Sequence, residues 1–166
     1  MLRRLHILPL TLLAAVALLG GCNRYLAREV QIETTDIATY GSAGADVTLH
    51  IVNRGDRPLR LEAAELRLTY DRGEVLYALL RDTVEAAPRW EGDVRLRCRL
   101  RIPDRGALYA VQQKLKRGQT QRMEVTFALR LCVGDAVKKI GRRRMPLSDF
   151  LNIFGLRPED LLTDFE

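Results

Sequence analysis

Apolar and polar residues alternate along most of this chain, which points to β-strands. The clearest case is the segment 93–102, where every second residue is apolar and four arginines lie between them: Arg95, Arg97, Arg99 and Arg101. A period of two over this length predicts a strand with one face in the core. Similar alternation predicts strands at 30–40, 46–53, 59–70, 75–80, 122–133 and 136–145. About seven short strands separated by turns are typical of an antiparallel β-sandwich of the immunoglobulin or fibronectin III type.

Turn residues separate these predicted strands. The segment 53–58 is a turn by composition, because it combines Asn, Gly, Asp and Pro. Asp71-Arg72-Gly73 predicts a tight hairpin in which Gly73 supplies the positive φ. Gly134-Asp135 predicts a second short connection.

One amphipathic helix is predicted between the strands, at 104–116. Its apolar residues recur three and four positions apart: Leu108, Val111 and Leu115. Asp104 suits the N-cap, and Gly118 suits the end of the helix.

The last segment, 146–166, is predicted to be a short helical extension. Ser148 begins a helix that Gly155 ends, and Pro158 opens a further turn. The extension carries six large apolar residues, too many for a free tail: Phe150, Leu151, Phe154, Leu161, Leu162 and Phe165. We expect them to cap an open end of the core, and docking onto a partner is the alternative.

The first 21 residues have the features of a secretory signal peptide. Arg3 and Arg4 form a basic tip, and an apolar run follows at 7–19. The run is shorter than the roughly 20 residues that cross a bilayer as a helix. It ends in the stretch 19–22, Leu-Gly-Gly-Cys, which resembles the lipobox read by the bacterial lipoprotein signal peptidase. An ordinary signal peptide and an uncleaved anchor are the alternatives.

The lipobox resemblance implies cleavage between Gly21 and Cys22, with acyl chains such as palmitate on Cys22. Two or more chains give stable anchoring, whereas one gives only marginal membrane binding. Residues 22–29 are then a tether, and the membrane is the first expected partner. Asn23 stands where Asp would mark inner-membrane retention in enterobacteria, which favours the periplasmic face of the outer membrane within the cell envelope.

Composition fits one anchored domain of ordinary size. Removing residues 1–21 from the 166 leaves 145, enough to bury a substantial core. The signal holds two arginines and no acids, so 25 of the 27 basic residues remain against 21 acidic ones, a net charge of +4. This mild excess permits contact with an anionic surface without requiring it.

The segment 30–140 resembles the type 2 late embryogenesis abundant (LEA14-like, or WHy) domain. The resemblance is carried by an alternating strand that ends in Asn, a Pro-Leu entry into the next strand, a Gly hairpin and a long alternating strand: 47–53, 58–61, 66–73 and 94–102. It implies a fibronectin-like sandwich over 30–145 with a non-catalytic role in scaffolding or stress protection. The chain departs from the family in having Asn53-Arg54 where Asn-Pro is usual, and in its helical tail.

Residues suited to catalysis or metal binding are scarce. His50 is the one histidine outside the signal, and its parity places it on the solvent side of a strand, without a Gly-x-Ser-x-Gly motif. No close cluster of Cys and His with metal-ligand spacing occurs, and no Gly-rich phosphate loop. We therefore expect no enzyme, no metal and no cofactor. An envelope enzyme that uses His50 as a base is a remote alternative.

The four arginines of 93–102 form the most unusual polar feature. They lie on one strand face about 6.6 Å apart, and like charges in a row repel. One hypothesis is that cross-strand carboxylates neutralise them, with Glu62, Glu65 and Glu124 as candidates.

The other hypothesis is a ligand: a lipid head group, lipopolysaccharide, a cell-wall polymer or an acidic envelope protein. Lys138 and Lys139, with Arg142, Arg143 and Arg144, would widen this anion-binding patch if their strand lies alongside. Nucleic acid is disfavoured by the compartment and by the lack of aromatic stacking platforms.

Cys98 and Cys132 are the two thiols left after Cys22. An envelope location would allow a disulfide between them, but their parities place them on opposite faces of their strands. Trp90, between a Pro and a Gly, is predicted to anchor the edge of the core rather than to stack on a ligand.

Overall fold

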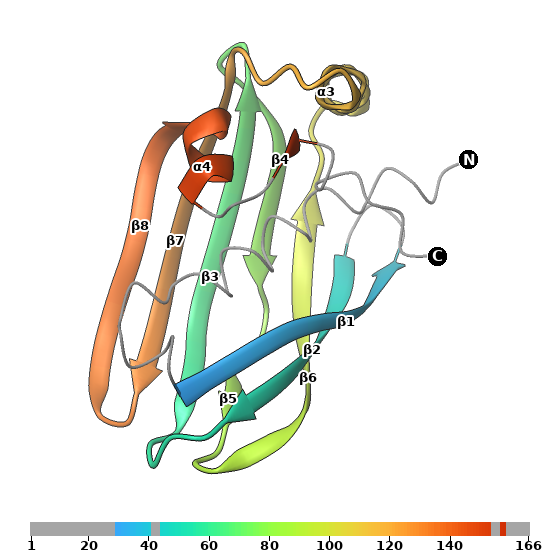
Figure 1. Ribbon diagram of the computed structural model, residues 1–166. Helices are drawn as coiled ribbons and strands as arrows, with labels where there is room; N and C mark the ends of the chain where they lie inside the picture. Colours follow the sequence, from blue (N-terminus) through green and yellow to red (C-terminus); the bar gives the residue numbers. More distant parts are fainter. Residues whose placement is uncertain (1–28, 41–43, 154–156, 159–166) are drawn as a thin grey trace.

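The computed structural model describes residues 29–40, 44–153 and 157–158 of the chain (Figure 1). The predicted signal, Cys22 and most of the tether lie outside these residues. So do Phe154, Gly155, Leu161, Leu162 and Phe165.

The described residues form eight strands and two helices. The strands are β1 (Val30–Tyr40), β2 (Gly44–Asn53), β3 (Leu59–Tyr70), β4 (Gly73–Leu80), β5 (Val84–Ala86), β6 (Trp90–Arg101), β7 (Met123–Val133) and β8 (Ala136–Pro146). The helices are α3 (Arg105–Lys116) and α4 (Leu147–Ile153). Every strand pairing is antiparallel. The all-β antiparallel prediction is therefore confirmed.

The strands form one continuous curled sheet in the order β1-β2-β6-β4-β3-β7-β8, with β5 added beside β3. The curl carries β1 diagonally across the face of the other strands, so that the sheet resembles a half-barrel (Figure 1). Register shifts in β1, β3 and β7 mark bulges, which increase local twist. A sandwich of the immunoglobulin or fibronectin III type is not confirmed, because hydrogen bonds link all the strands into one sheet.

Alternation along the strands builds a single core on the inner face of the sheet. In β2 the residues at 45, 47, 49 and 51 are buried, and their neighbours are partly exposed. In β6 the inner positions are Leu96, Cys98 and Leu100, while the arginines between them point outward. The inner face is the side on which α4 packs, because Phe150 of α4 contacts Phe127 of β7 edge-to-face, with ring centroids 5.8 Å apart.

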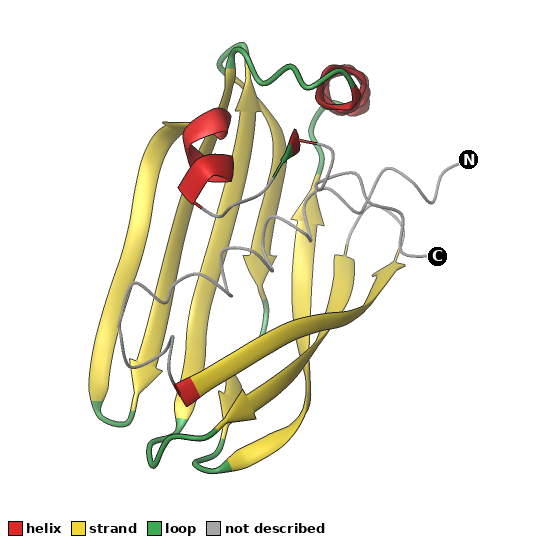
Figure 2. Cartoon of the chain, viewed as in Figure 1, coloured by secondary structure: helices red, strands yellow, loops and turns green. Residues whose placement is uncertain are grey.

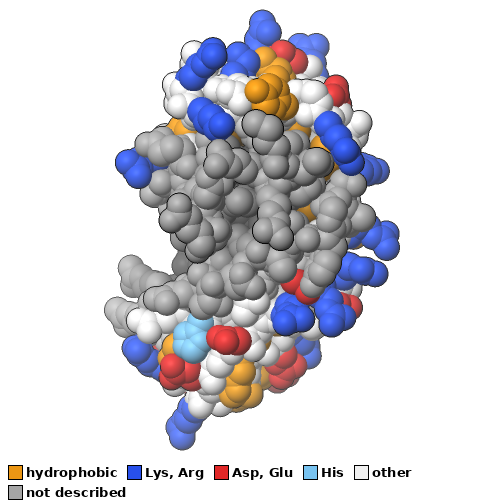
Figure 3. Space-filling view, turned by 90° about the vertical axis from the view of Figure 1, so that its right-hand side faces the viewer, with side chains coloured by type: hydrophobic (Ala, Val, Ile, Leu, Met, Phe, Trp, Pro, Cys, Tyr) orange, Lys and Arg blue, Asp and Glu red, His pale blue; other side chains and the backbone are white. Residues whose placement is uncertain are grey.

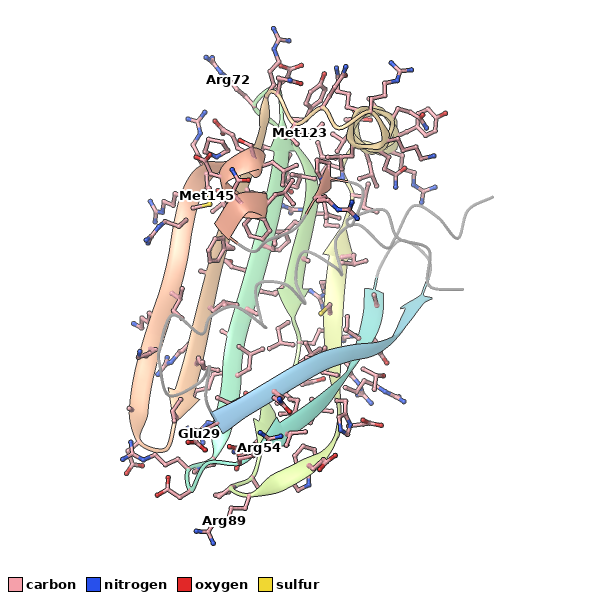
Figure 4. All side chains as sticks on the ribbon, in the orientation of Figure 1. Glu29, Arg54, Arg72, Arg89, Met123 and Met145 are labelled. Carbon is pink, nitrogen blue, oxygen red and sulfur yellow. The ribbon has the colours of Figure 1, made fainter. Side chains whose placement is uncertain are left out.

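Both helices lie at the same end of the sheet (Figure 2). In α4, Leu147, Phe150 and Leu151 are buried in the core, and the labelled Met123 and Met145 lie near this helix (Figure 4). The expectation that Phe150 and Leu151 cap an open end of the core is therefore confirmed.

The predicted helix at 104–116 is confirmed with both of its ends. Asp104 is the N-cap, and its Oδ1 accepts a hydrogen bond from the Ala107 N–H at 3.0 Å. Gly118 has φ +68° and donates to Leu115 O at 2.9 Å, as a glycine does after a helix. The inner side of the helix buries Leu108, Val111 and Leu115.

The hairpin at 71–73 forms, but the prediction for Gly73 is wrong. Positive φ angles occur at Asp71 (50°) and Arg72 (68°), while Gly73 pairs with Tyr70 as the first residue of β4. A two-residue turn with both central residues left-handed matches the twist of the flanking strands. At the other predicted hairpin, Gly134 does adopt a positive φ of 59°.

Asn53 ties together two loops at the opposite end of the sheet. Its side chain is buried, at 2% exposure. Its Nδ2 donates to the carbonyls of Arg57, Ala86 and Ala87 at 2.9, 3.3 and 2.9 Å, and its Oδ1 accepts from the Gly55 N–H at 3.1 Å. The short strand β5 precedes Pro88, and the Asn53 amide joins this strand to the β2–β3 turn.

Trp90 packs against the margin of the core, as predicted. Its ring lies so close over Gly92 that a Cβ there would come within 2.4 Å of the indole. The tryptophan ring therefore occupies space that any side chain at position 92 would need.

Candidate anion-binding face

The outer face of β6 presents the four arginines side by side, as their parity predicted. Arg95, Arg97, Arg99 and Arg101 are all exposed. β2 pairs with β6 on one side, and β4 pairs with it on the other. We call this surface the arginine face. In the space-filling view, basic side chains follow one edge of the molecule (Figure 3).

Carboxylates neutralise only part of the arginine face. Arg101 donates to Glu74 Oε1 from Nη2 at 2.6 Å and from Nε at 3.2 Å. Arg95 Nη1 lies 3.9 Å from Asp46 Oδ2, beyond hydrogen-bonding distance. Within the described part of the chain, neither Arg97 nor Arg99 makes an ion pair.

The three carboxylates expected to neutralise the stripe do not do so. Glu62 pairs with Arg60 and Arg130, and Glu124 pairs with Arg144. Glu65 accepts a hydrogen bond from the Tyr77 hydroxyl at 3.4 Å. The expectation fails because the strand order places β4, and not β3 or β7, beside β6.

Tyr77 organises the end of the arginine face that does carry counter-charge. The guanidinium carbons of Arg67 and Arg101 each lie 5.2 Å from the centroid of its ring. Glu74 pairs with both arginines, at 3.0 Å from Arg67 Nε and 2.6 Å from Arg101 Nη2. This network holds Arg101 in place.

A hollow of about 390 Å³ opens beside the other end of the stripe. Three arginines border it, Arg81, Arg95 and Arg97, together with Asp46. Arg81 was not among the predicted residues. It follows the last residue of β4, so alternation along the sequence carried no signal for it. Only the β4–β6 pairing brings it beside Arg97.

The basic residues of β8 do not widen the arginine face. β4, β3 and β7 all lie between β6 and β8, which is the edge strand. Arg142 donates to its neighbouring carbonyl at Gly141, and Arg144 Nε donates to Glu124 Oε2 at 2.9 Å. The hydrogen bond to Glu124 raises the pKa of Arg144. Arg143 is exposed on the same strand.

His50 is held by two carboxylates of the neighbouring strand. Its Nδ1 lies 2.8 Å from Asp93 Oδ1, and its Nε2 lies 3.2 Å from Glu91 Oε1. The hydrogen bond to Asp93, followed by that to Glu91, raises the pKa of His50 above its ordinary value. Figure 3 shows the histidine flanked by acidic side chains. The sequence interpretation placed His50 correctly on the outer face but missed its partners on β6.

Cys98 and Cys132 are both buried and free, so the candidate disulfide is absent. Cys98 faces the core, where burial raises the pKa of its thiol to about 12. Cys132 lies on the other face, beside Arg60 and Glu62. Hydrogen bonding to its thiol raises the pKa of Arg60 and lowers the pKa of Glu62. The two thiols therefore lie on opposite faces, as their positions in the strands predicted.

Among the residues that the structure describes, no group of three or more His, Cys, Asp or Glu side chains is arranged to hold a metal ion. No helix within the same ranges is long and apolar enough to cross a bilayer.

No protein-family model and no curated protein matches the chain. Similar solved structures include a protein from Archaeoglobus fulgidus, with a TM-score of 0.39 and 10% identity over 68% of this chain and 88% of that one. The GAE domain of yeast GGA1 has a TM-score of 0.34 and 8% identity, over 69% and 87% of the two chains. The GAE domain of GGA2p from Saccharomyces cerevisiae has a TM-score of 0.32 and 9% identity, over 72% and 89%. Such low values say nothing about the function of this chain.

Proposed function

We propose that the protein is a lipid-anchored component of the bacterial cell envelope that acts by binding and not by catalysis. The anchor is argued from the lipobox-like stretch that ends at Cys22, since two or more acyl chains hold a protein stably at a membrane. We place it at the periplasmic face of the outer membrane. The LEA14-like resemblance supports a scaffolding or stress-protective role for the domain.

The same resemblance supports a distorted fibronectin-like sandwich as the finer description of the fold. One layer would be β1, β2 and β6, and the other β4, β3, β7 and β8. The ladder between β4 and β6 has only four residue pairs, Tyr77–Leu80 with Cys98–Arg101. A ladder this short is a suitable place for a sheet to fold from one layer into the other.

The function we propose for the domain is binding of an anionic envelope component through the arginine face. One observation carries this proposal: Arg97 and Arg99 are exposed side by side, and no described carboxylate pairs with either of them. A row of like charges is unfavourable unless counter-charge is supplied, and a ligand is one source of it. Surface charge of one sign also speeds the association of an oppositely charged partner.

Covalent crosslinking in the intact envelope tests this function. The native protein is compared with an Arg97→Gln/Arg99→Gln variant, and an Arg105→Gln/Arg117→Gln variant serves as the control. The control removes the same charge from exposed positions at the two ends of α3. We expect a defined partner that is captured by the native protein and the control and is lost from the first variant. Equal capture by all three proteins would contradict the arginine face as the binding surface.

The anchor is tested separately, by labelled palmitate and membrane fractionation. Cys22→Ser should abolish incorporation of the label and release the protein from the membrane fraction. Continued labelling of the variant would contradict lipidation at Cys22 without bearing on the arginine face.

A further inference from the structure

We propose that the hollow bordered by Arg81, Arg95 and Arg97 is a binding site for a phosphate group, free or esterified as in a phosphorylated head group. This inference rests on the proposed function. It names the part of the arginine face that makes specific contact and the chemistry that this part recognises.

The main chain brings Arg81 to the stripe. β4 ends at Leu80, which pairs with Cys98. The next amide, of Arg81, donates to the Arg97 carbonyl at 2.8 Å, which fixes the backbone of Arg81 beside β6. On the other side of β6, Asp46 of β2 lies opposite Arg97 in the register of the two strands. Arginines from two separate segments therefore converge on one hollow with a fixed backbone.

The hollow has more positive than negative charge. Asp46 is the one carboxylate among the described residues that line it, and its side chain is only 13% exposed. Its 3.9 Å separation from Arg95 Nη1 is too long for a hydrogen bond. Arg81 and Arg97 have no ion-pair partner in the described ranges. Among the described residues, one carboxylate faces three guanidiniums, so N–H donors remain that no described carboxylate accepts from.

A phosphate group uses such donors better than a carboxylate does. Each guanidinium presents a planar fork of N–H donors that can bind two phosphate oxygens at once. A phosphate offers its oxygens in a tetrahedral array, so that arginines approaching from different sides can each find acceptors. A carboxylate has two oxygens in one plane and a single charge. Convergence of Arg81, Arg95 and Arg97 on one hollow therefore favours the phosphate.

The hollow is large enough to admit a phosphate that is esterified to a larger group. Its volume is about 390 Å³. An inorganic phosphate would fill only part of that space. Room remains for the group to which the phosphate is esterified.

Equilibrium dialysis tests the site with the lipidated protein in micelles of an uncharged detergent. The probe is radiolabelled inorganic phosphate, and glycerol phosphate and acetate are the competitors. We expect saturable binding that acetate displaces poorly. Stronger displacement by glycerol phosphate than by unlabelled phosphate would identify an esterified phosphate as the ligand, and weaker displacement would identify the free ion. Equal displacement would show that the hollow recognises the phosphate group alone. Acetate competing as well as glycerol phosphate would overturn the assignment to phosphate.

Two single variants locate the site. Arg81→Gln should weaken binding about tenfold, the effect of losing one charge-assisted contact, and Arg81→Lys should recover only part of the loss because the planar fork is absent. Arg105→Gln is the control, since it removes one charge from an exposed position at the start of α3 that lies outside both the arginine face and the hollow. We expect it to change affinity by less than about twofold.

Equal losses in Arg81→Gln and Arg105→Gln would overturn the phosphate site, because an arginine outside the hollow would then matter as much as one that borders it. No saturable binding to the native protein would also overturn the site. In both cases the crosslinking comparison of Arg97→Gln/Arg99→Gln still decides the proposed function by itself.

Discussion

At the scale of single residues, His50 links two neighbouring strands through protonation. Its ring contacts Asp93 at one nitrogen and Glu91 at the other, and both carboxylates belong to β6. The side chain of His50 is 33% exposed, so solvent screens this interaction. Protonated His50 can donate to both carboxylates, whereas the neutral ring can donate to only one of them.

This arrangement predicts a pH-dependent contribution to stability. Folding raises the pKa of His50, so the stabilisation is fully present below the ordinary pKa of about 6.5 and is lost as the pH rises through the raised value. Compared with His50→Gln, the native protein should have the higher melting temperature at about pH 6. The difference should disappear by about pH 8.5. If the melting temperatures of the two proteins changed with pH in the same way, protonation of His50 would not contribute to stability.

Asn53 gives a larger prediction at the same scale, because its contacts are buried. Asn53→Ala would leave three carbonyls and the Gly55 N–H without their present partner. We expect a loss of about 2–3 kcal/mol in the free energy of unfolding, measured with urea. Asn152→Ala, at an exposed position of α4, is the control and should change little. A loss below about 0.5 kcal/mol in Asn53→Ala would mean that water replaces the amide without cost.

At the scale of elements, the β3–β4 hairpin contains one residue that is poorly suited to its geometry. Asp71 and Arg72 both have positive φ, which favours Asn, Asp or Gly in a turn of this kind, and Arg72 is none of these. Arg72→Gly should stabilise the protein by about 0.5–1 kcal/mol, because glycine adopts φ +68° without steric cost. Thermal unfolding measures the effect. Lys139→Gly, in the interior of β8, should destabilise by a similar amount, and stabilisation by both changes would contradict the turn argument.

Elements whose signal is local were predictable from the sequence. Strict alternation identified β2 and β6, and Asp104 with Gly118 identified both ends of α3. The short strand β5 was missed, because three residues are too few to show an alternating pattern of apolar and polar positions. They form a strand through their pairing with β3. The hairpin was predicted at the correct place, but the residues with positive φ were not. Their positions depend on how β3 and β4 are aligned, and the presence of Gly73 does not reveal that alignment.

At the scale of the whole molecule, strand order could not be derived from the sequence, and the candidate site depends on it. The pairing of β4 with β6 decides that Glu74 and not Glu65 neutralises Arg101, and that Arg81 joins the hollow. The same order separates β8 from the arginine face. Parity along one strand fixes which side chains share a face. Which strand lies beside it depends on long-range packing, which no local pattern encodes.

Closure of the core at its helical end is also a property of the whole molecule. α4 follows the edge strand β8, and it returns over the inner face to bury Phe150 against Phe127 of β7. This contact joins the last described helix to the centre of the core. Without it, the end of the sheet near Met123 and Met145 (Figure 4) would lose its cover.

Phe150→Ala should therefore lower the free energy of unfolding by about 3–5 kcal/mol, the usual cost of removing a buried phenyl ring. Phe150→Leu should recover much of the loss, because it refills most of the volume without the aromatic contact. If α4 only covers the sheet, amide exchange in Phe150→Ala should accelerate first in α4 and β8 and reach β2 and β6 only with global unfolding. Uniform acceleration across all the strands would instead make α4 a part of the cooperative core, on which every pairing in the sheet depends.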